Sequence, residues 1–227
     1  MTLQIGMLLF PRITQLDLTG PLELFHRVPD AQVSLLWKDL DPVRTTSGMR
    51  ILPSATLRDG PPLDVLVVPG GYGTADLLDD AQVLDWLAAQ AKTARYVTSV
   101  CTGALVLGAA GLLRGYDAAT HWAYMDLLPC FGARPVRQRV VVDRNRVTAG
   151  GVTAGIDFGL RIVAELAGDE TAQAIQLGLE YDPEPPFPCG HPDVAPAAMV
   201  TRVRALLEPA VEAHRAKARL WRAPAGV

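Results

Sequence analysis

Apolar residues in this chain cluster in short segments separated by glycine, proline and polar residues. Where such a segment is apolar throughout, it predicts a strand that is covered on both faces, as in a parallel sheet. The segments that predict single strands are Leu3–Phe10, Ala31–Lys38, Leu63–Val68, Tyr96–Val100 and Asp117–Thr120. Two further segments carry turn residues near their centre and predict antiparallel hairpins. They are Val43–Leu52, around Thr46-Ser-Gly48, and Arg137–Ala149, around Asp143-Arg-Asn145.

Segments with helical periodicity alternate with these strands. Thr19-Gly-Pro21 predicts the start of a helix that runs through His26. Gly111 predicts the C-cap of a second helix, Thr102–Ala110. The remaining predicted helices are Ala81–Ala91, His121–Leu128, a helix from Thr153 to Leu166, Glu170–Leu179 and about Ala195–Leu220.

This alternation predicts an α/β fold. We expect a mostly parallel sheet flanked by helices on both faces, a flavodoxin-like sandwich, with short antiparallel hairpin additions. The length suits a single domain over residues 1–227, with a C-terminal helical extension from about residue 193. Tyr181–Pro192 is too rich in proline for regular structure and predicts a rigid loop.

Composition and charge narrow the functional classes. Hydrophobic residues make up 49% and charged residues 20% of the chain, as in ordinary globular enzymes. The net charge of -3 provides no basic field for nucleic acid or for an anionic membrane, and the basic residues of Arg202–Arg222 suit the solvated face of a helix. The apolar N-terminal run is too short to span a membrane and lacks the features of a signal peptide, so we expect a cytoplasmic protein.

The cysteines give no sign of a structural bridge or a metal. Cys101, Cys130 and Cys189 are an odd number without CxxC spacing, which predicts reduced thiols. Cys189 lies near His191, but two ligands in a proline-rich loop are too few to predict a metal site. The glycines of Pro69–Thr74 lack the full spacing of a dinucleotide fingerprint, so we expect no nucleotide site.

Candidate chemistry follows the ends of the predicted strands. In open α/β sheets, ligands bind beyond the carboxyl ends of the strands. Asp17 follows the first strand, and Cys101 stands where a strand gives way to a helix. The other segments at this edge are Gly70-Gly71, Thr102 and Gly150-Gly151.

Cys101 stands at a predicted strand-to-helix elbow. Such a turn holds a side chain above the sheet, and the helix N-terminus favours the thiolate, so Cys101 is the predicted nucleophile. The alternative is a buried cysteine that packs as a small apolar group. Asp17 either caps its helix or faces Cys101; in the second case the two groups should share one proton, because both cannot ionise cheaply.

Other side chains and backbone groups complete the predicted site. The Thr102 hydroxyl is expected within reach of Cys101 and Asp17, with local helix capping as its alternative role. Gly70, Gly71 and Gly150 offer backbone N–H groups to a substrate, unless they serve only as turns. His121 is either the base of a Cys-His pair and a substrate-binding residue, or a structural residue.

Several motifs resemble one enzyme superfamily. Ser99–Gly115, together with Thr120-His-Trp122, resembles the elbow of the ThiJ/PfpI superfamily, within the class I glutamine amidotransferase-like fold. Further segments extend the likeness over nearly the whole chain and are similar to the isocyanide hydratase (isonitrile hydratase) family. They are Leu16–Pro21, Pro69–Gly71, Gly150–Asp157 and Leu179–Pro183.

The resemblance implies a reaction and roles for three residues. It implies hydration of an isocyanide to an N-substituted formamide, through a thioimidate intermediate, by a homodimer without a cofactor. Cys101 would be the nucleophile, Asp17 the general acid/base and Thr102 its hydrogen-bonding partner. Many superfamily members carry a glutamate beside the cysteine, whereas this chain has the shorter Asp17, as the hydratases do.

Two rival functions remain open at this point. One is another cysteine-dependent hydrolase of the superfamily, an amidase or a deglycase, that uses Cys101 with His121. The other is a non-catalytic sensor domain related to AraC-type regulators, although only one long helical pattern follows the proline-rich loop and a DNA-reading unit would need more. A third possibility is an oxidation sensor, since an exposed Cys101 thiolate of low pKa oxidises readily, and this role could coexist with catalysis.

Overall fold

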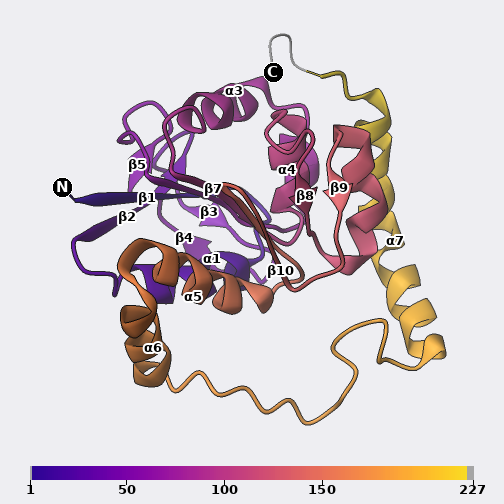
Figure 1. Cartoon of the computed structure of the whole chain (residues 1–227). Coiled ribbons are helices and arrows are strands. Elements are labelled where there is room, and N and C mark those ends of the chain that lie inside the picture. Colours follow the sequence, from indigo (N-terminus) through magenta and orange to yellow (C-terminus); the bar gives the residue numbers. More distant parts are fainter. Residues whose placement is uncertain (1, 224–227) are drawn as a thin grey trace.

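A seven-stranded sheet forms the centre of the computed structural model, which describes residues 2–223 (Figure 1). The strand order is β10-β11-β7-β6-β1-β2-β5, and all neighbours are parallel except the pair β10 and β11. The strands are β1 (Leu3–Leu8), β2 (Ala31–Trp37), β5 (Ala55–Thr56), β6 (Val65–Val68), β7 (Tyr96–Val100), β10 (Val140–Asp143) and β11 (Arg146–Ala149). The predicted α/β class with a mostly parallel sheet is therefore confirmed.

Helices cover both faces of this sheet. Figure 1 shows α1 and α5 on one face and α3 and α4 on the other. Because of this cover, all four residues of β6 are buried, as its apolar sequence predicts. The helices are α1 (Gln15–Phe25), α2 (Thr74–Leu77), α3 (Ala81–Gln90), α4 (Gly103–Ala109), α5 (Ala154–Ala167), α6 (Asp169–Gly178), α7 (Ala197–Leu220) and the 3-10 helix η1 (Trp122–Phe131).

Both predicted hairpins are present. In the longer one, β10 and β11 pair across a two-residue turn in which Arg144 has φ of 54°. The other hairpin has shorter strands than predicted. These are β3 (Val43–Arg44) and β4 (Arg50–Ile51), which form a separate two-stranded sheet. The strand predicted at Asp117–Thr120 is also shorter and separate: β8 (Asp117–Ala118) pairs with β9 (Arg134–Pro135).

The start of the first helix differs from the prediction. Helix α1 begins at Gln15, and Pro21 lies inside it. The proline removes one backbone hydrogen bond, but the helix buries Leu18, Leu24 and Phe25 against the core, and this burial outweighs the loss. Asp17 therefore lies in the first turn of α1 rather than in a loop.

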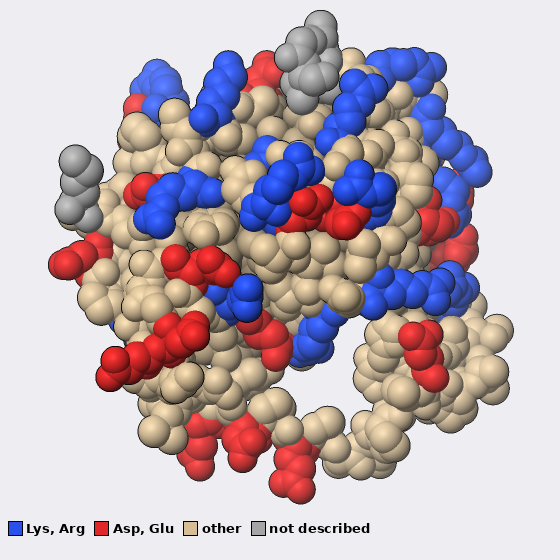
Figure 2. Space-filling model, in the orientation of Figure 1, with Lys and Arg blue, Asp and Glu red and all other residues tan. Residues whose placement is uncertain are grey.

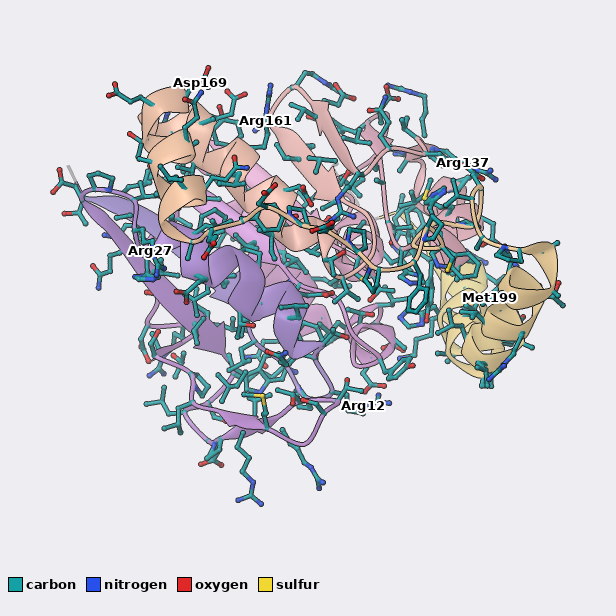
Figure 3. The ribbon with its side chains drawn as sticks, turned by 90° about the horizontal axis from the view of Figure 1, so that it is seen from below. Arg12, Arg27, Arg137, Arg161, Asp169 and Met199 are labelled. Carbon is teal, nitrogen blue, oxygen red and sulfur yellow. The ribbon has the colours of Figure 1, made fainter. Side chains whose placement is uncertain are left out.

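The C-terminal segments extend away from the sheet. Figure 3 shows the proline-rich loop leaving α6, which starts at Asp169, and reaching α7 near Met199. In Figure 2 an opening separates this loop from the body of the molecule. Helix α7 then packs on η1 and α2, and the residues it buries are Val211, His214 and Ala218. Within the described part of the chain, no helix has both the length and the apolar character needed to cross a membrane.

Glycine at position 103 allows α4 to lie directly on the end of β6. A Cβ there would stand 2.0 Å from the Val68 carbonyl oxygen and 2.7 Å from that of Pro69. We expect Gly103→Ala to lower the free energy of unfolding by about 2 kcal/mol or more, because backbone atoms would have to move. Gly178→Ala is the matched control, since a Cβ at that helical position meets open space. Urea denaturation that gave both variants equal stability would contradict this packing.

Candidate active site

The carboxyl ends of four adjacent strands meet where the sequence places its candidate chemistry. Strands β11, β7, β6 and β1 are consecutive neighbours in the sheet. Cys101 follows β7, Gly70 follows β6, Gly150 follows β11, and Asp17 lies on the helix after β1. The predicted meeting of these segments at one edge of the sheet is therefore confirmed.

Cys101 occupies a sharp turn between β7 and α4. Its φ of 56° lies in the left-handed region that non-glycine residues rarely adopt. Its N–H donates to the carbonyls of Ala149 (3.1 Å) and Gly150 (2.9 Å), and its own carbonyl accepts from the Thr120 hydroxyl at 2.7 Å. These bonds from the neighbouring segments hold the elbow in its strained conformation.

Gly70 is the point where Asp17 and Cys101 come together. A Cβ on Gly70 would lie 2.6 Å from Asp17 Oδ2, 2.7 Å from Cys101 Cβ and 2.7 Å from the Thr102 nitrogen. The carboxyl and the cysteine side chain thus crowd around a space that only a glycine leaves open. The Gly70 N–H also donates to Asp17 Oδ2 at 3.0 Å and so fixes the carboxyl in this position.

Burial sets the protonation of this pair. Asp17 is fully buried, and burial raises its pKa to about 7, against the opposing effects of the Gly70 N–H and the Cys101 side chain. Burial, followed by the Asp17 charge, raises the pKa of Cys101 well above its ordinary value, although the N–H groups of Thr102 and Val152 oppose the rise. At neutral pH the two groups therefore hold at least one proton between them.

The expectation of an exposed, readily formed thiolate is wrong. Cys101 is only 6% exposed, and the favourable effect of the helix N-terminus is smaller than the cost of burying a second negative charge beside Asp17.

The two oxygens of Asp17 differ from each other in their hydrogen bonds. Oδ2 accepts from Gly70, whereas the buried Oδ1 has no hydrogen-bond partner among the described residues. Among the described residues, Oδ1 therefore has no donor to stabilise its negative charge, which agrees with the raised pKa of the carboxyl.

Thr102 is close to the pair, but its hydroxyl is bonded elsewhere. Its Oγ1 accepts from the Gly71 N–H at 3.0 Å and lies 2.9 Å from Thr74 Oγ1. This differs from the expected contact of the hydroxyl with Asp17 and Cys101. The N–H groups of Gly70 and Gly71 are likewise not free for a substrate, because they donate to Asp17 and Thr102. Their contribution is to hold side chains.

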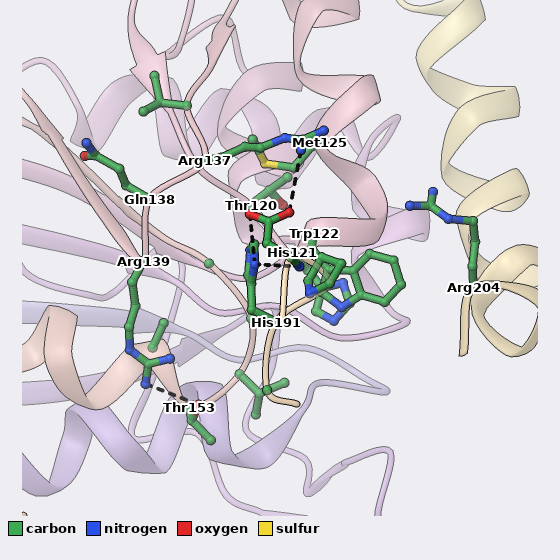
Figure 4. Close-up of a pocket in the computed structure, with 18 residues that line it drawn as sticks. Thr120, His121, Trp122, Met125, Arg137, Gln138, Arg139, Thr153, His191 and Arg204 are labelled. Atoms are coloured by element: carbon green, nitrogen blue, oxygen red, sulfur yellow. Dashed lines mark hydrogen bonds and ion pairs between the residues drawn. The ribbon is translucent and has the colours of Figure 1, made fainter. Parts of the chain in front are cut away.

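A cavity of about 680 Å³ opens beside the elbow (Figure 4). It is bounded by η1, by the segment after β11, by the proline-rich loop and by α7. Gly150 and His121, both predicted to bind substrate, line it. Other lining residues are Thr120, Trp122, Met125, Gly151, Val152, His191, Asp193 and Arg204.

His121 lies in the wall of this cavity without a hydrogen bond to Cys101 among the described contacts. Its Nδ1 accepts the Ala123 N–H at 3.3 Å, so a neutral ring carries its proton on Nε2. Burial lowers the pKa of His121 to about 4, which makes the ring a weak base at neutral pH. This arrangement does not support His121 as the base of a Cys-His pair.

Four groups that form hydrogen bonds at the site were not predicted from the sequence. They are the Thr120 hydroxyl, the Val152 N–H, the Thr74 hydroxyl and the His214 ring. Thr120 and Val152 lie within the family motifs Thr120-His-Trp122 and Gly150–Asp157, so their place near the site could have been predicted. His214 lies 140 residues from its partner Thr74, and no motif links the two. In the described part of the chain, no group of three His, Cys, Asp or Glu side chains is arranged to hold a metal ion.

Comparisons with known proteins agree with this architecture. A model of the DJ-1/PfpI family matches residues 4–165. The chain therefore belongs to the DJ-1/PfpI family. The solved structure of a ThiJ/PfpI family protein from Pseudomonas syringae superimposes with a TM-score of 0.94 and 45% identity, over 96% of this chain and 91% of that one.

Two curated relatives bear on the rival functions. The chain is 57% identical over 212 residues to an isonitrile hydratase of Pseudomonas putida, which is 93% of each protein. This match confirms the resemblance predicted from the motifs. The chain is also 32% identical over 187 residues to the HTH-type transcriptional regulator GbdR of Pseudomonas aeruginosa, and it spans only 50% of that regulator.

The raised pKa of Asp17 predicts a pH-dependent loss of stability. From about pH 4 to pH 7 the unfolded carboxyl ionises while the folded one keeps its proton, so the protein loses up to about 1.4 kcal/mol per pH unit from its free energy of unfolding. Asp17→Asn removes this loss. We therefore expect its stability relative to the parent protein to rise from pH 4 to pH 7 and to level off above.

Urea denaturation at several pH values checks this expectation. The matched control is Asp85→Asn, at an exposed position of α3. If the difference in stability between the Asp17→Asn variant and the parent protein stayed constant from pH 4 to pH 8, the carboxyl would not be protonated in the way its burial implies.

Proposed function

We propose that this protein hydrates isocyanides to N-substituted formamides, with Cys101 as nucleophile and Asp17 as general acid and base. The observation that carries the proposal is the contact of these two groups around Gly70, where burial holds the pKa of Asp17 at about 7. An acid that titrates near neutral pH can both give and take a proton under working conditions. The identity with the Pseudomonas putida isonitrile hydratase supports the same reaction.

The first half of the proposed reaction uses one proton twice. The Asp17 carboxylate takes the proton of the Cys101 thiol, and the thiolate attacks the terminal carbon of the isocyanide. A carbon–sulfur bond forms and negative charge develops on that carbon. Asp17 then delivers its proton to the carbon, which gives a thioimidate, R–N=CH–S–Cys101, and restores the carboxylate.

Water completes the reaction in the second half. Asp17 removes a proton from a water molecule as the oxygen attacks the thioimidate carbon, and this proton passes to the nitrogen. The tetrahedral intermediate then loses its hydroxyl proton to Asp17, the carbon–sulfur bond breaks, and the formamide R–NH–CHO leaves. Return of the proton from Asp17 to sulfur regenerates the starting state. These proposed reaction steps need no cofactor.

The surroundings of the pair suit these steps. The N–H groups of Thr102 and Val152 stabilise negative charge on the sulfur, which the high pKa of the thiol otherwise disfavours. The adjoining cavity accommodates the R group, and its wall includes the apolar side chains of Trp122 and Met125. Because His121 presents its Nε2–H at this wall, we propose that it binds substrate as a donor rather than acting as the base.

We further propose a single domain that acts as a homodimer in the cytoplasm. Burial of the α7 residues His214 and Val211 supports the single domain. Phe187 on the proline-rich loop, Val194 shortly after it and Leu206 on α7 are 72%, 63% and 71% exposed, and such apolar surface is typical of contacts with another subunit. A reduced catalytic thiol suits a reducing compartment.

Removing the thiol provides the direct test. We expect Cys101→Ala to abolish conversion of an alkyl or aryl isocyanide to its formamide, measured by chromatography of the product, because no thioimidate can form. Cys130→Ala, which removes an exposed cysteine, is the matched control and should leave turnover unchanged. An active Cys101→Ala protein would exclude the mechanism. A parent protein inactive on several isocyanides would favour the hydrolase or the sensor function.

The pH dependence tests the role of Asp17. The reactive pair holds one proton, so we expect kcat/KM to rise as the pH increases through about 7, where the doubly protonated pair loses its first proton, and to fall at alkaline pH with loss of the second. Asp17→Asn should lower kcat by about 10² to 10⁴-fold and remove the rising limb near pH 7. Retention of that limb in the Asn variant would assign the titration to another group.

A further inference from the structure

His214 on α7 reaches the back of the active-site turn. It is 1% exposed, and its Nε2 lies 2.8 Å from the Thr74 hydroxyl, while its Nδ1 lies 2.7 Å from the Ala210 carbonyl oxygen. The family match ends at residue 165, so this side chain comes from the C-terminal segment beyond the matched region. The proposed reaction does not use it directly.

Four hydrogen bonds lead from His214 to Asp17, and the first is the bond between His214 and Thr74. Thr74 Oγ1 lies 2.9 Å from Thr102 Oγ1 and 2.7 Å from the Gly71 carbonyl oxygen. Thr102 Oγ1 in turn accepts the Gly71 N–H at 3.0 Å. The neighbouring N–H, that of Gly70, donates to Asp17 Oδ2. Every member of this series, from His214 to Asp17, is buried or a backbone group of the Gly70-Gly71 turn.

The number of protons in this network determines which group donates and which accepts in each hydrogen bond. The Ala210 carbonyl can only accept, so His214 must carry a proton on Nδ1. Burial lowers the pKa of His214 and keeps the ring neutral, which leaves Nε2 as an acceptor. The Thr74 hydroxyl has one proton for three acceptors, namely His214 Nε2, Thr102 Oγ1 and the Gly71 carbonyl oxygen. Its donation to Nε2 leaves the Gly71 carbonyl oxygen to the Thr102 hydroxyl, which donates to it at 3.2 Å. The Thr102 oxygen then keeps a lone pair for the Gly71 N–H.

We propose that His214 is a positioning residue for the proposed hydration: by accepting from Thr74 it orients the Thr74 and Thr102 hydroxyls, and so holds the Gly70-Gly71 turn that places the Asp17 carboxyl against Cys101. This inference rests on the proposed function. His214 does not touch the reacting atoms, so its effect reaches them through the turn. A small shift of that turn matters, because a displacement of about 1 Å at a catalytic group can cost about 10²-fold in rate.

Substitutions at residue 214 separate the hydrogen bond from the packing. His214→Phe keeps a ring against Tyr124, whose ring centroid is 5.0 Å away, but removes both polar atoms. An Asn amide can donate to Ala210 but does not extend to Thr74, whereas the longer Gln can place its oxygen near the position of Nε2. His214→Asn and His214→Gln are therefore a matched pair that differs in the bond to Thr74.

We expect kcat for isocyanide hydration to fall about tenfold in the Phe and Asn variants, with KM changed by less than about twofold, and to recover to within about threefold of the parent in the Gln variant. Val211→Ala is the packing control, because it removes a buried side chain of α7 that has no part in the hydrogen bonds. It should lower the melting temperature without lowering kcat. In a Thr74→Val background, His214→Phe should have no further effect on kcat.

A second measurement does not depend on the substrate. Alkylation of Cys101 by iodoacetamide at pH 7, followed by mass spectrometry of its peptide, should also slow about tenfold in the Phe and Asn variants and recover in the Gln variant, since the thiol loses its correctly placed base. If the parent protein hydrated no isocyanide but this pattern held, the proposed function would fail and the positioning role would stand.

Three results would overturn the positioning role. The first is a folded Asn variant with parent-like kcat and alkylation rate. The second is a loss of kcat in Val211→Ala as large as that in the residue 214 variants. The third is a folded Gln variant as slow as the Asn variant. Should His214→Phe fail to fold, the Asn and Gln pair decides the question.

Discussion

The Asp17 carboxyl and the Cys101 thiol, which both become negatively charged when they ionise, are buried together around Gly70. The arrangement of the surrounding segments holds these two groups in contact. Asp17 and Cys101 approach the same space at Gly70, where any other residue would push them apart. Outside water, neither group ionises easily beside the other, and the pair retains a proton at neutral pH. In the proposed reaction, this is the proton that Asp17 delivers to the substrate carbon after Cys101 has attacked it.

The parallel sheet makes this contact possible because it gathers distant segments at one edge. Strands β1, β6, β7 and β11 lie next to one another, so the segments that follow them converge although they are far apart in the chain. The elbow at Cys101 is strained and is held by the carbonyls of Ala149 and Gly150 at the end of β11 and by the Thr120 hydroxyl. The strain is therefore balanced by neighbouring segments rather than by the elbow itself.

The C-terminal segment adds to this frame from two directions. The proline-rich loop contributes His191, and the residue after the loop, Asp193, also lies in the wall of the cavity. Helix α7 contributes Arg204 to the same cavity and His214 to the network behind the Gly70-Gly71 turn. A segment outside the family match thus contributes both to the wall of the cavity and to the hydrogen bonds behind the Gly70-Gly71 turn.

Local pattern was sufficient to predict most of the fold and part of the site. Apolar strands, glycine and proline turns and the strand-to-helix position of Cys101 are properties of short stretches, so the sheet, the hairpins and the elbow could be predicted from them. The early start of α1 could not, because burial of its apolar side outweighs the proline inside it. The short elements β5, β9 and α2 carry too few residues to form a recognisable pattern.

The sequence by itself determined that Cys101 would stand at an elbow and that Asp17 and Gly70 would reach the same edge of the sheet. Only the tertiary structure decided that burial raises the pKa of the thiol, that the glycine N–H groups bind side chains, that His121 bonds to Ala123, and that His214 meets Thr74. The reason is physical. Burial and hydrogen-bond partners depend on which distant segments pack together, and no local pattern of residues carries that information.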